Sequence, residues 1–236
     1  MISVCIATYN GAAYIREQIQ SILPQLGKDD EIVVSDDGST DETLMTIKAI
    51  HDERIIVLPP HEQLGSTRNF YNAIDSAKGD IIFLADQDDI WLPGRVKRCL
   101  KELETVDMVV TDSQVVDEHL QLLYPSLFQL YNLHAGFWHN LMHCGFYGSM
   151  MAMRKEIVDK ARPWPENELI KHDWWLGMVA EKMGRVRFVA DQQYMLYRRH
   201  DGTETIVSNS LLKRSKRSLK VKLMARIEML NEISKK

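Results

Sequence analysis

Cysteine is scarce in this 236-residue sequence, and its spacing does not suit a structural metal. Cys5, Cys99 and Cys144 are odd in number and include no CxxC pair. Such usage is typical of free thiols in a reducing compartment, and it excludes a zinc knuckle.

Long hydrophobic runs are absent as well. No apolar run approaches the roughly 20 residues that a membrane-spanning helix needs. The apolar residues 2–6 follow no basic segment of the kind that opens a signal peptide. We therefore expect a cytoplasmic protein, either soluble or peripheral on the inner face of the cell membrane.

Two common phosphate-binding loops are also missing. Neither GxxxxGKS/T nor GxGxxG occurs in the chain. Because these loops hold the phosphates in P-loop enzymes and in Rossmann dehydrogenases, neither class fits the sequence.

The formal net charge of -4 conceals an uneven distribution. Residues 213–236 hold nine Lys and Arg against two Glu, or +7, which leaves 20 basic and 31 acidic residues, or -11, in the rest. An acidic body whose basic residues do not interleave with aromatic ones argues against nucleic acid as a partner.

The basic tail also carries large apolar residues, namely Leu219, Leu223, Met224, Ile227, Leu230 and Ile233. A basic amphipathic helix over residues 211–236 is typical of a membrane-surface element. The alternative is that this helix packs on its own domain or on a second copy in a homodimer.

Patterns typical of strands and helices alternate through the first half. The predicted strands cover residues 2–7, 31–35, 55–58, 80–85 and 107–111. Between them apolar residues recur at helical spacing. Ser39 and Glu42 form a capping-box pattern, and Pro93 suits the first residue of the helix after Trp91. Repeated units with fully apolar strands predict an α/β fold, in which helices cover both faces of a parallel sheet.

The second half is less regular. Residues 119–147 are rich in Leu, Tyr, Phe and His without a clean period. We predict strands at 149–153, 186–190 and 194–197, and a helix at 173–183 that ends at Gly184.

Polar clusters follow three of the predicted strands, where parallel sheets bind their ligands. Thr8, Tyr9 and Asn10 follow the first strand, Asp36 and Asp37 the second, and residues 86–88 the fourth. We expect these three loops to meet in one site.

The third loop, Asp86-Gln87-Asp88, raises an electrostatic question. Carboxylates this close repel one another, and burial adds a desolvation cost. A positive group should therefore offset them. Hard oxygen ligands of this kind suit Mg²⁺ or Mn²⁺, although two acidic residues in a turn are also common without a metal.

Taken in order, the motifs resemble those of family 2 glycosyltransferases, and most closely the rhamnosyltransferase-like branch that builds bacterial surface polysaccharides. The matching segments are Thr8-Tyr9-Asn10-Gly11, Ser35-Asp36-Asp37-Gly38-Ser39-Thr40-Asp41, Leu64-Gly65 with Arg68-Asn69, Asp86-Gln87-Asp88-Asp89-Ile90-Trp91 and His172-Asp173-Trp174-Trp175. The resemblance covers about residues 1–202. It implies the GT-A fold, a single Rossmann-like domain with a mostly parallel sheet.

The resemblance also implies a division of the chain and a set of donor contacts. Residues 1–112 would form the nucleotide-sugar-binding half, residues 113–205 the acceptor and catalytic half, and residues 206–236 a basic helical tail. The implied nucleotide-binding residues are Thr8, Tyr9, Asn10, Asp36, Asp37, Arg68, Asp86 and Gln87. The implied ligands for Mn²⁺ or Mg²⁺ are Asp88, Asp86 and His200.

In the family resembled, Asp173 would be the general base that activates an acceptor hydroxyl, and the reaction would invert the anomeric centre. Trp174, Trp175 and Arg198 would contact acceptor or diphosphate. The residues alone also allow simpler interpretations of several of these positions. In these, Asp173 caps a helix, the two Trp lie in the core, and Arg68, among the implied nucleotide contacts, is an exposed helix residue.

The function implied is transfer of a sugar from a UDP- or dTDP-linked donor, dTDP-rhamnose included, to a glycan or lipid-linked glycan in surface polysaccharide assembly. Two alternatives stay open. One is a nucleotidyltransferase that makes such a donor, although its glycine-rich, Arg-containing first loop is absent. The other is a non-catalytic scaffold that binds nucleotide.

Overall fold

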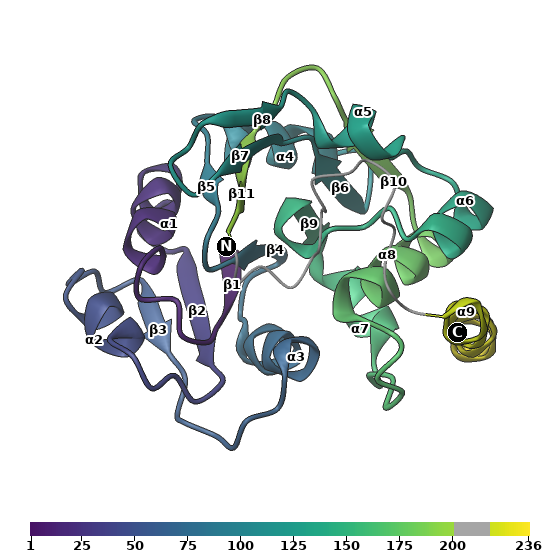
Figure 1. The fold of residues 1–236 in the computed structure, drawn as a ribbon, viewed down its shortest axis with the longest axis horizontal. Helices are drawn as coiled ribbons and strands as arrows, with labels where there is room; N and C mark the ends of the chain where they lie inside the picture. The colour runs from purple at the N-terminus through teal and green to yellow at the C-terminus, as the bar shows by residue number, and fades with distance from the viewer. Residues whose placement is uncertain (201–217) are drawn as a thin grey trace.

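The structure, a computed structural model, describes residues 1–200 and 218–236 (Figure 1). A seven-stranded sheet runs through it in the order β10-β6-β9-β4-β1-β2-β3. The strands are β1 (Ile2–Thr8), β2 (Glu31–Asp36), β3 (Ile55–Val57), β4 (Ile81–Asp86), β6 (Met108–Thr111), β9 (Met151–Arg154) and β10 (Val186–Val189).

The sheet is mostly parallel, as predicted. Of the seven strands that the described residues form in this sheet, only β9 runs the other way, and it pairs antiparallel with both β4 and β6. β1 and β2 are buried along almost their whole length. Strands buried on both faces are expected where helices cover a parallel sheet.

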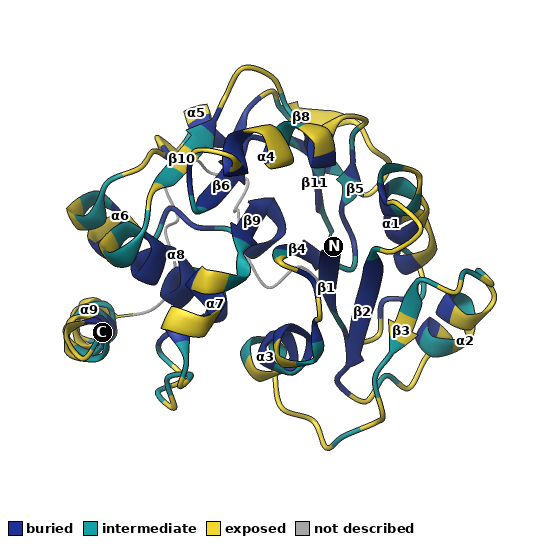
Figure 2. Ribbon diagram, turned by 180° about the vertical axis from the view of Figure 1, so that it is seen from behind, coloured by how far each residue is buried: buried dark blue, intermediate teal, exposed yellow. Residues whose placement is uncertain are grey.

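Helices cover both faces of this sheet (Figure 1). α1 (Ile15–Ile22) and α4 (Arg95–Leu103) lie on one side, and α3 (Ser66–Ser76), α7 (Lys155–Ala161) and α8 (His172–Met183) lie on the other. α2 (Thr43–Lys48) contacts α1 near the β3 edge. In Figure 2 the central strands are buried, while the outer surfaces of the helices are exposed.

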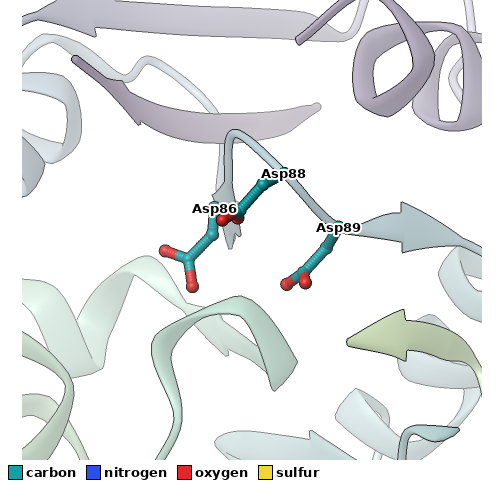
Figure 3. Close-up of side chains that lie close together, drawn as sticks. All are labelled: Asp86, Asp88 and Asp89. Atoms are coloured by element: carbon teal, nitrogen blue, oxygen red, sulfur yellow. The ribbon is translucent and has the colours of Figure 1, made fainter. Parts of the chain in front are cut away.

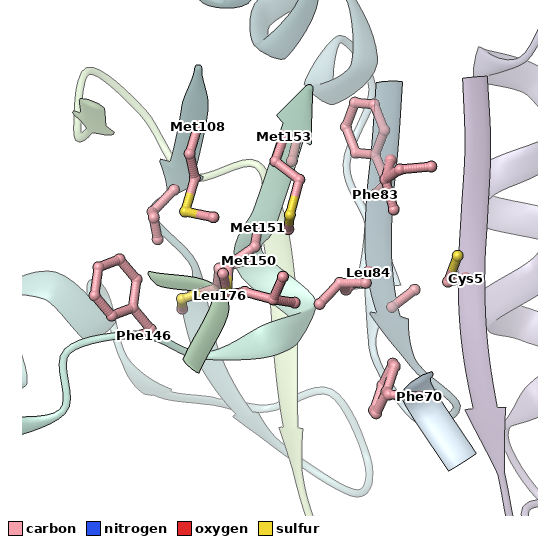
Figure 4. Close-up of a cluster of buried hydrophobic side chains, with 14 of the residues drawn as sticks. Cys5, Phe70, Phe83, Leu84, Met108, Phe146, Met150, Met151, Met153 and Leu176 are labelled. Atoms are coloured by element: carbon pink, nitrogen blue, oxygen red, sulfur yellow. The ribbon is translucent and has the colours of Figure 1, made fainter. Parts of the chain in front are cut away.

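The core lies between the sheet and these helices. Phe83 and Leu84 of β4 are fully buried beside Met151 and Met153 of β9 (Figure 4). Unbranched methionine side chains fill irregular space, which suits the point where strand direction changes.

A second sheet, of four short strands in the order β5-β11-β7-β8, was not predicted. Its strands are β5 (Ile90–Trp91), β7 (Gln114–Asp117), β8 (Leu122–Tyr124) and β11 (Met195–Arg199). Because β5 directly follows the acidic loop and pairs with β11, this sheet brings residues near 200 to the loop at 86–89. Between β8 and β9 lie α5 (Leu127–Tyr131) and α6 (Phe137–His143).

Three local predictions were wrong. Ser39 does not cap α2: its hydroxyl donates to Asp36, and α2 begins at Thr43, whose N–H donates to Asp41 (3.0 Å). Pro93 precedes α4, which begins at Arg95 after Gly94 in a left-handed conformation. The strand predicted at 149–153 begins later, because Gly148–Met150 forms a 3₁₀ turn ahead of β9.

The tail forms a helix, α9 (Leu219–Ser234), which contacts α6 and α8. The predicted boundary at 205–206 lies outside the described residues. Among the described residues, no helix combines the length and apolarity needed to cross a bilayer.

Candidate active site

Strand register brings the three predicted loops together at one edge of the main sheet. Thr8 pairs with Asp36 across β1 and β2, and Ala7 pairs with Asp86 across β1 and β4. Because these three neighbouring strands are parallel, their carboxyl ends open on the same side.

A cavity of about 390 Å³ lies at this edge. The predicted site residues that line it are Thr8, Tyr9, Asp37, Asp86, Gln87, Asp88 and Asp173. Residues from both halves of the chain therefore meet around one space.

The two aspartates after β2 have different surroundings. The Asp36 carboxylate accepts hydrogen bonds from the hydroxyls of Thr8 (2.8 Å) and Ser39 (2.6 Å) and from the backbone N–H groups of Gly38 and Ser39. Its acceptor capacity is thus filled within the protein. The Asp37 carboxylate, which lines the cavity, accepts from two backbone N–H groups that lead into α3, those of residues 64 (2.6 Å) and 65 (2.9 Å).

Hydrogen bonds tie the first loop to the other two, through Gln87 to the third loop and through Asn10 to the second. The Gln87 amide accepts from the Tyr9 N–H (2.9 Å) and donates to the Tyr9 carbonyl (3.0 Å). The Asn10 side chain accepts from the Thr40 N–H (2.8 Å). A Cβ at Gly11 would overlap the Gln87 amide, so a larger residue there would displace this side chain.

Asp86, Asp88 and Asp89 form a compact acidic cluster (Figure 3), with one carboxylate oxygen of each within 4.8 Å of the others. Burial and the neighbouring Asp89 and Asp88 carboxylates raise the pKa of Asp86 well above its ordinary value. Burial and Asp88 raise the pKa of Asp89 to about 7. The protein therefore does not fully neutralise the negative charge of these three carboxylates.

Arg95 supplies part of the positive charge that offsets these carboxylates. It is fully buried, its guanidinium lies 4.3 Å from the centre of the Trp91 ring, and it donates to the Ser149 carbonyl (2.5 Å). Burial lowers the pKa of Arg95 to about 10, while Asp89 raises it, so the guanidinium stays charged at neutral pH.

Asp89 ties the acidic loop to β11 rather than lining the cavity. It is 1% exposed, and its Oδ1 accepts from the backbone N–H of Arg198 (3.0 Å). Its Oδ2 is buried and has no hydrogen-bond partner among the described residues. An unpartnered buried oxygen beside two further carboxylates fits a site for a divalent cation.

His200 lies where the resemblance implied a metal ligand. Its Nε2 is 2.8 Å from Asp88 Oδ2, and its ring lies 4.6 Å from the ring of Tyr14. Arg198 instead points to α1, where it pairs with Glu17 (2.5 Å) and lies over Tyr14. Arg198 does not line the cavity.

Asp173 lies in the first turn of α8 and lines the cavity opposite the acidic loop. Its Oδ1 accepts the N–H of Trp174 (2.7 Å), so the side chain also satisfies part of the helix start. Asp173 contributes to the raised pKa of Asp86, which indicates that the two carboxylates lie close enough to interact across the cavity.

Trp174, Trp175 and Arg68 lie away from the cavity lining. Both indoles are buried in the core, donating to the carbonyls of Asn140 and Ala161 (2.9 Å each), so neither offers a face to a sugar. Arg68 is exposed and lines a neighbouring groove that shares Gly65 and Ser66 with the cavity.

Sequence reasoning assigned no role to several residues that line the cavity, among them Phe70, Tyr147, His172 and Tyr197. His172 stacks on Phe70 with ring centres 4.1 Å apart. Gly148 allows this packing, since a Cβ there would lie 2.9 Å from His172 Nε2. Residues 144–148 follow no period that could have revealed them.

The model of glycosyl transferase family 2 matches residues 3–162. The chain belongs to this family.

Two relatives illustrate its range. The dTDP-rhamnosyl transferase RfbG of Shigella flexneri is 28% identical over 228 residues, which cover 89% of this chain and 77% of that protein. The UDP-Glc:α-D-GlcNAc-diphosphoundecaprenol β-1,3-glucosyltransferase WfaP of Escherichia coli is 34% identical over 105 residues, covering 44% of this chain and 42% of that protein.

Solved structures show the same fold. Residues 1–349 of Staphylococcus aureus TarS, in complex with UDP-GlcNAc, match with a TM-score of 0.71 at 19% identity, covering 98% of this chain and 72% of that one. The mannosyltransferase PcManGT of Pyrobaculum calidifontis, with GDP-Man and Mn²⁺, matches with a TM-score of 0.61 at 19% identity, covering 82% and 55%. The fold is therefore GT-A.

Proposed function

We propose that this protein is an inverting, metal-dependent glycosyltransferase that moves a sugar from a UDP- or dTDP-linked donor to a glycan acceptor. One observation carries the proposal: Asp173 and the carboxylates of Asp86 and Asp88 line a single cavity at the carboxyl edge of the sheet. A base and a diphosphate-binding group on opposite sides are what direct displacement at an anomeric carbon needs.

The donor nucleotide would lie over the ends of β1 and β2. Asp36 is engaged by four donors from the protein, whereas Asp37 lines the cavity and retains lone pairs. We therefore assign the contact with the pyrimidine N3–H to Asp37, and to Asp36 the task of holding Thr8 and the turn at residue 38.

The residues that would hold the divalent cation are Asp86, Asp88 and His200, and the unpartnered Oδ2 of Asp89 lies beside the first two. When bound, it would neutralise the diphosphate and act as a Lewis acid on the leaving group. Asp89 keeps this loop in register with β11 through the Arg198 N–H.

Asp173 would accept the proton of the acceptor hydroxyl as the oxygen attacks the anomeric carbon. The new C–O bond forms on the face opposite the departing nucleoside diphosphate, whose oxygen takes the electron pair of the bond that breaks. The configuration is thereby inverted. The carboxylate is held in place by the Trp174 N–H, which leaves its second oxygen for the acceptor.

Replacement of Asp173 by Asn tests the base. The amide keeps the shape but cannot take up the proton, so turnover should fall at least about 100-fold. Nucleotide binding measured by calorimetry should stay unchanged. The matched control is Asp159→Asn on the neighbouring helix α7, which should retain activity. Normal turnover by Asp173→Asn would reject the assignment.

Donor and metal can be tested together by thermal shift. We expect UDP or dTDP, and their sugars, to raise the melting temperature in the presence of Mn²⁺. The match to RfbG along most of the chain places dTDP-rhamnose first among the donors to screen. Asp88→Ala should abolish the metal-dependent part of the shift; an unchanged shift would argue against the cation site.

A further inference from the structure

α9 presents an apolar stripe to solvent. Leu219, Leu223, Ile227 and Leu230 are spaced at i, i+4, i+8 and i+11, which places them on one face of a helix. Their exposed fractions are 86%, 61%, 48% and 37%. The stripe runs for about 17 Å at 1.5 Å per residue.

A second face of α9, about 115° around the helix from the stripe, fastens the helix to the domain. Ala225, Met229 and Ile233 are buried where α9 packs on α6 and α8. Lys182 of α8 donates to the Ile233 carbonyl (2.7 Å). Because this face is held by the domain, the stripe is directed outward. The sequence pattern had grouped Ile233 with the stripe, but the structure separates them.

α6, which contacts α9, also exposes large apolar side chains. Trp138 and Met142 are 70% and 52% exposed, and their i, i+4 spacing places them on one face of that helix. Arg226 of α9 donates to the Met142 carbonyl (2.5 Å), which links the two helices beside the stripe. Figures 1 and 2 place α6 and α9 together at one edge of the molecule. We call the four stripe residues with Trp138 and Met142 the α6–α9 surface.

Cations flank the stripe on both sides. At 3.6 residues per turn, Lys220 and Arg226 each lie about 60° from its centre, on opposite sides. Glu228 and Glu232 lie more than about 120° from it. The charge next to the apolar side chains is therefore positive.

We propose that the α6–α9 surface docks onto an anionic lipid bilayer. The apolar side chains and the Trp138 ring would enter the interface, while Lys220 would contact lipid headgroups. Arg226, whose guanidinium donates to the carbonyls of Lys222 and Met142, would add its positive charge beside the stripe. A second copy of the chain fits less well, because pairing two stripes would bring their cationic flanks together.

This inference adds a location to the proposed function. α9 packs on α8, whose first turn carries Asp173, and the Arg226 guanidinium lies 6.0 Å from the ring of the adjacent Trp174. A docked bilayer would thus lie one helix away from the proposed base, which suits an acceptor carried on a lipid.

Vesicle co-sedimentation of the full chain tests the surface. We expect binding to phosphatidylcholine vesicles that contain phosphatidylglycerol, and weak binding to phosphatidylcholine alone. The double variant Leu223→Gln/Ile227→Gln should bind the anionic vesicles at least about tenfold more weakly, since two apolar side chains no longer partition. Met45→Gln, which alters a 64% exposed apolar residue on α2, is the matched control and should bind normally.

A further substitution tests how much positive charge contributes to vesicle binding. Lys220→Gln should weaken binding to the anionic vesicles about fivefold and leave binding to neutral vesicles unchanged. The melting temperature of each variant verifies folding, and the substituted side chains are exposed enough that it should not change.

Three results would overturn the proposal: no binding of the unaltered chain, equal binding to neutral and anionic vesicles, or normal binding by the double variant. If sedimentation velocity instead showed a dimer that the double variant dissociates, the surface would belong to a second copy. The assay contains no donor sugar, so its failure would leave the transferase proposal untouched.

Discussion

The acidic cluster makes the stability of the metal-free protein depend on pH in an unusual direction. The pKa of Asp89 is raised from 3.8 to about 7, first by burial and then by Asp88. Between these two values the folded protein holds a proton that the unfolded chain has already lost. The contribution of Asp89 to the free energy of unfolding should therefore be most favourable below about pH 4, and it should be lost as the pH rises toward 7.

The size of the effect follows from the shift. About 3 pH units at 1.36 kcal/mol each amount to about 4 kcal/mol. Asp89 is 1% exposed, so solvent screens little of this cost. The raised pKa of Asp86 acts in the same direction.

Asp89→Asn isolates this contribution. The amide oxygen can still accept a hydrogen bond from the backbone N–H of Arg198, but the side chain no longer titrates. In urea denaturation at pH 5 and pH 7.5 without metal, the wild type should lose about 2–3 kcal/mol more than the variant, because this interval covers about two of the three pH units. Asp29→Asn, at an exposed carboxylate, is the control and should follow the wild type.

Mn²⁺ should offset most of the stability that is lost between pH 5 and pH 7.5. At 100 times its dissociation constant it should add about 2.7 kcal/mol at pH 7.5. It should add much less at pH 5, where protons compete for the same oxygens. If metal-free wild-type protein were equally stable at both pH values, or if Asp89→Asn lost stability in parallel with it, the description of the cluster as uncompensated would be refuted.

Three further predictions concern packing and the loops. Gly177→Ala on α8 should destabilise the protein by about 1–3 kcal/mol in urea denaturation, because its Cβ would overlap the buried Phe146 ring; stabilisation, as helix propensity alone predicts, would contradict this packing. At pH 8 the half-buried Cys144 should react with a disulfide reagent before Cys5 and Cys99, since burial raises the pKa of both, that of Cys99 to about 11; three equal rates would contradict the core. Gly11→Ala should displace the Gln87 amide and weaken nucleotide binding in calorimetry while costing about 1–2 kcal/mol of stability; unchanged binding would show that the Tyr9–Gln87 pair does not shape the site.

The sequence by itself determined the main sheet and the location of the site. Strands β1, β2 and β4 are mostly apolar runs that stand out in the sequence. In the segments between them, apolar residues recur at helical spacing, which marks the helices. Because parallel sheets bind ligands at the carboxyl ends of their strands, the polar clusters that begin at Thr8, Asp36 and Asp86 could be assigned to one edge from the sequence alone.

Tertiary structure decided the rest, because it depends on contacts between residues far apart in the chain. β5 has two residues and pairs with β11 about 100 positions later, so no local pattern marks the second sheet. The same long-range packing distinguishes Asp37 from Asp36 and encloses Trp174 in the core. The apolar residues of α9 are alike in sequence; only the contact with α6 and α8 determines which face stays in solvent.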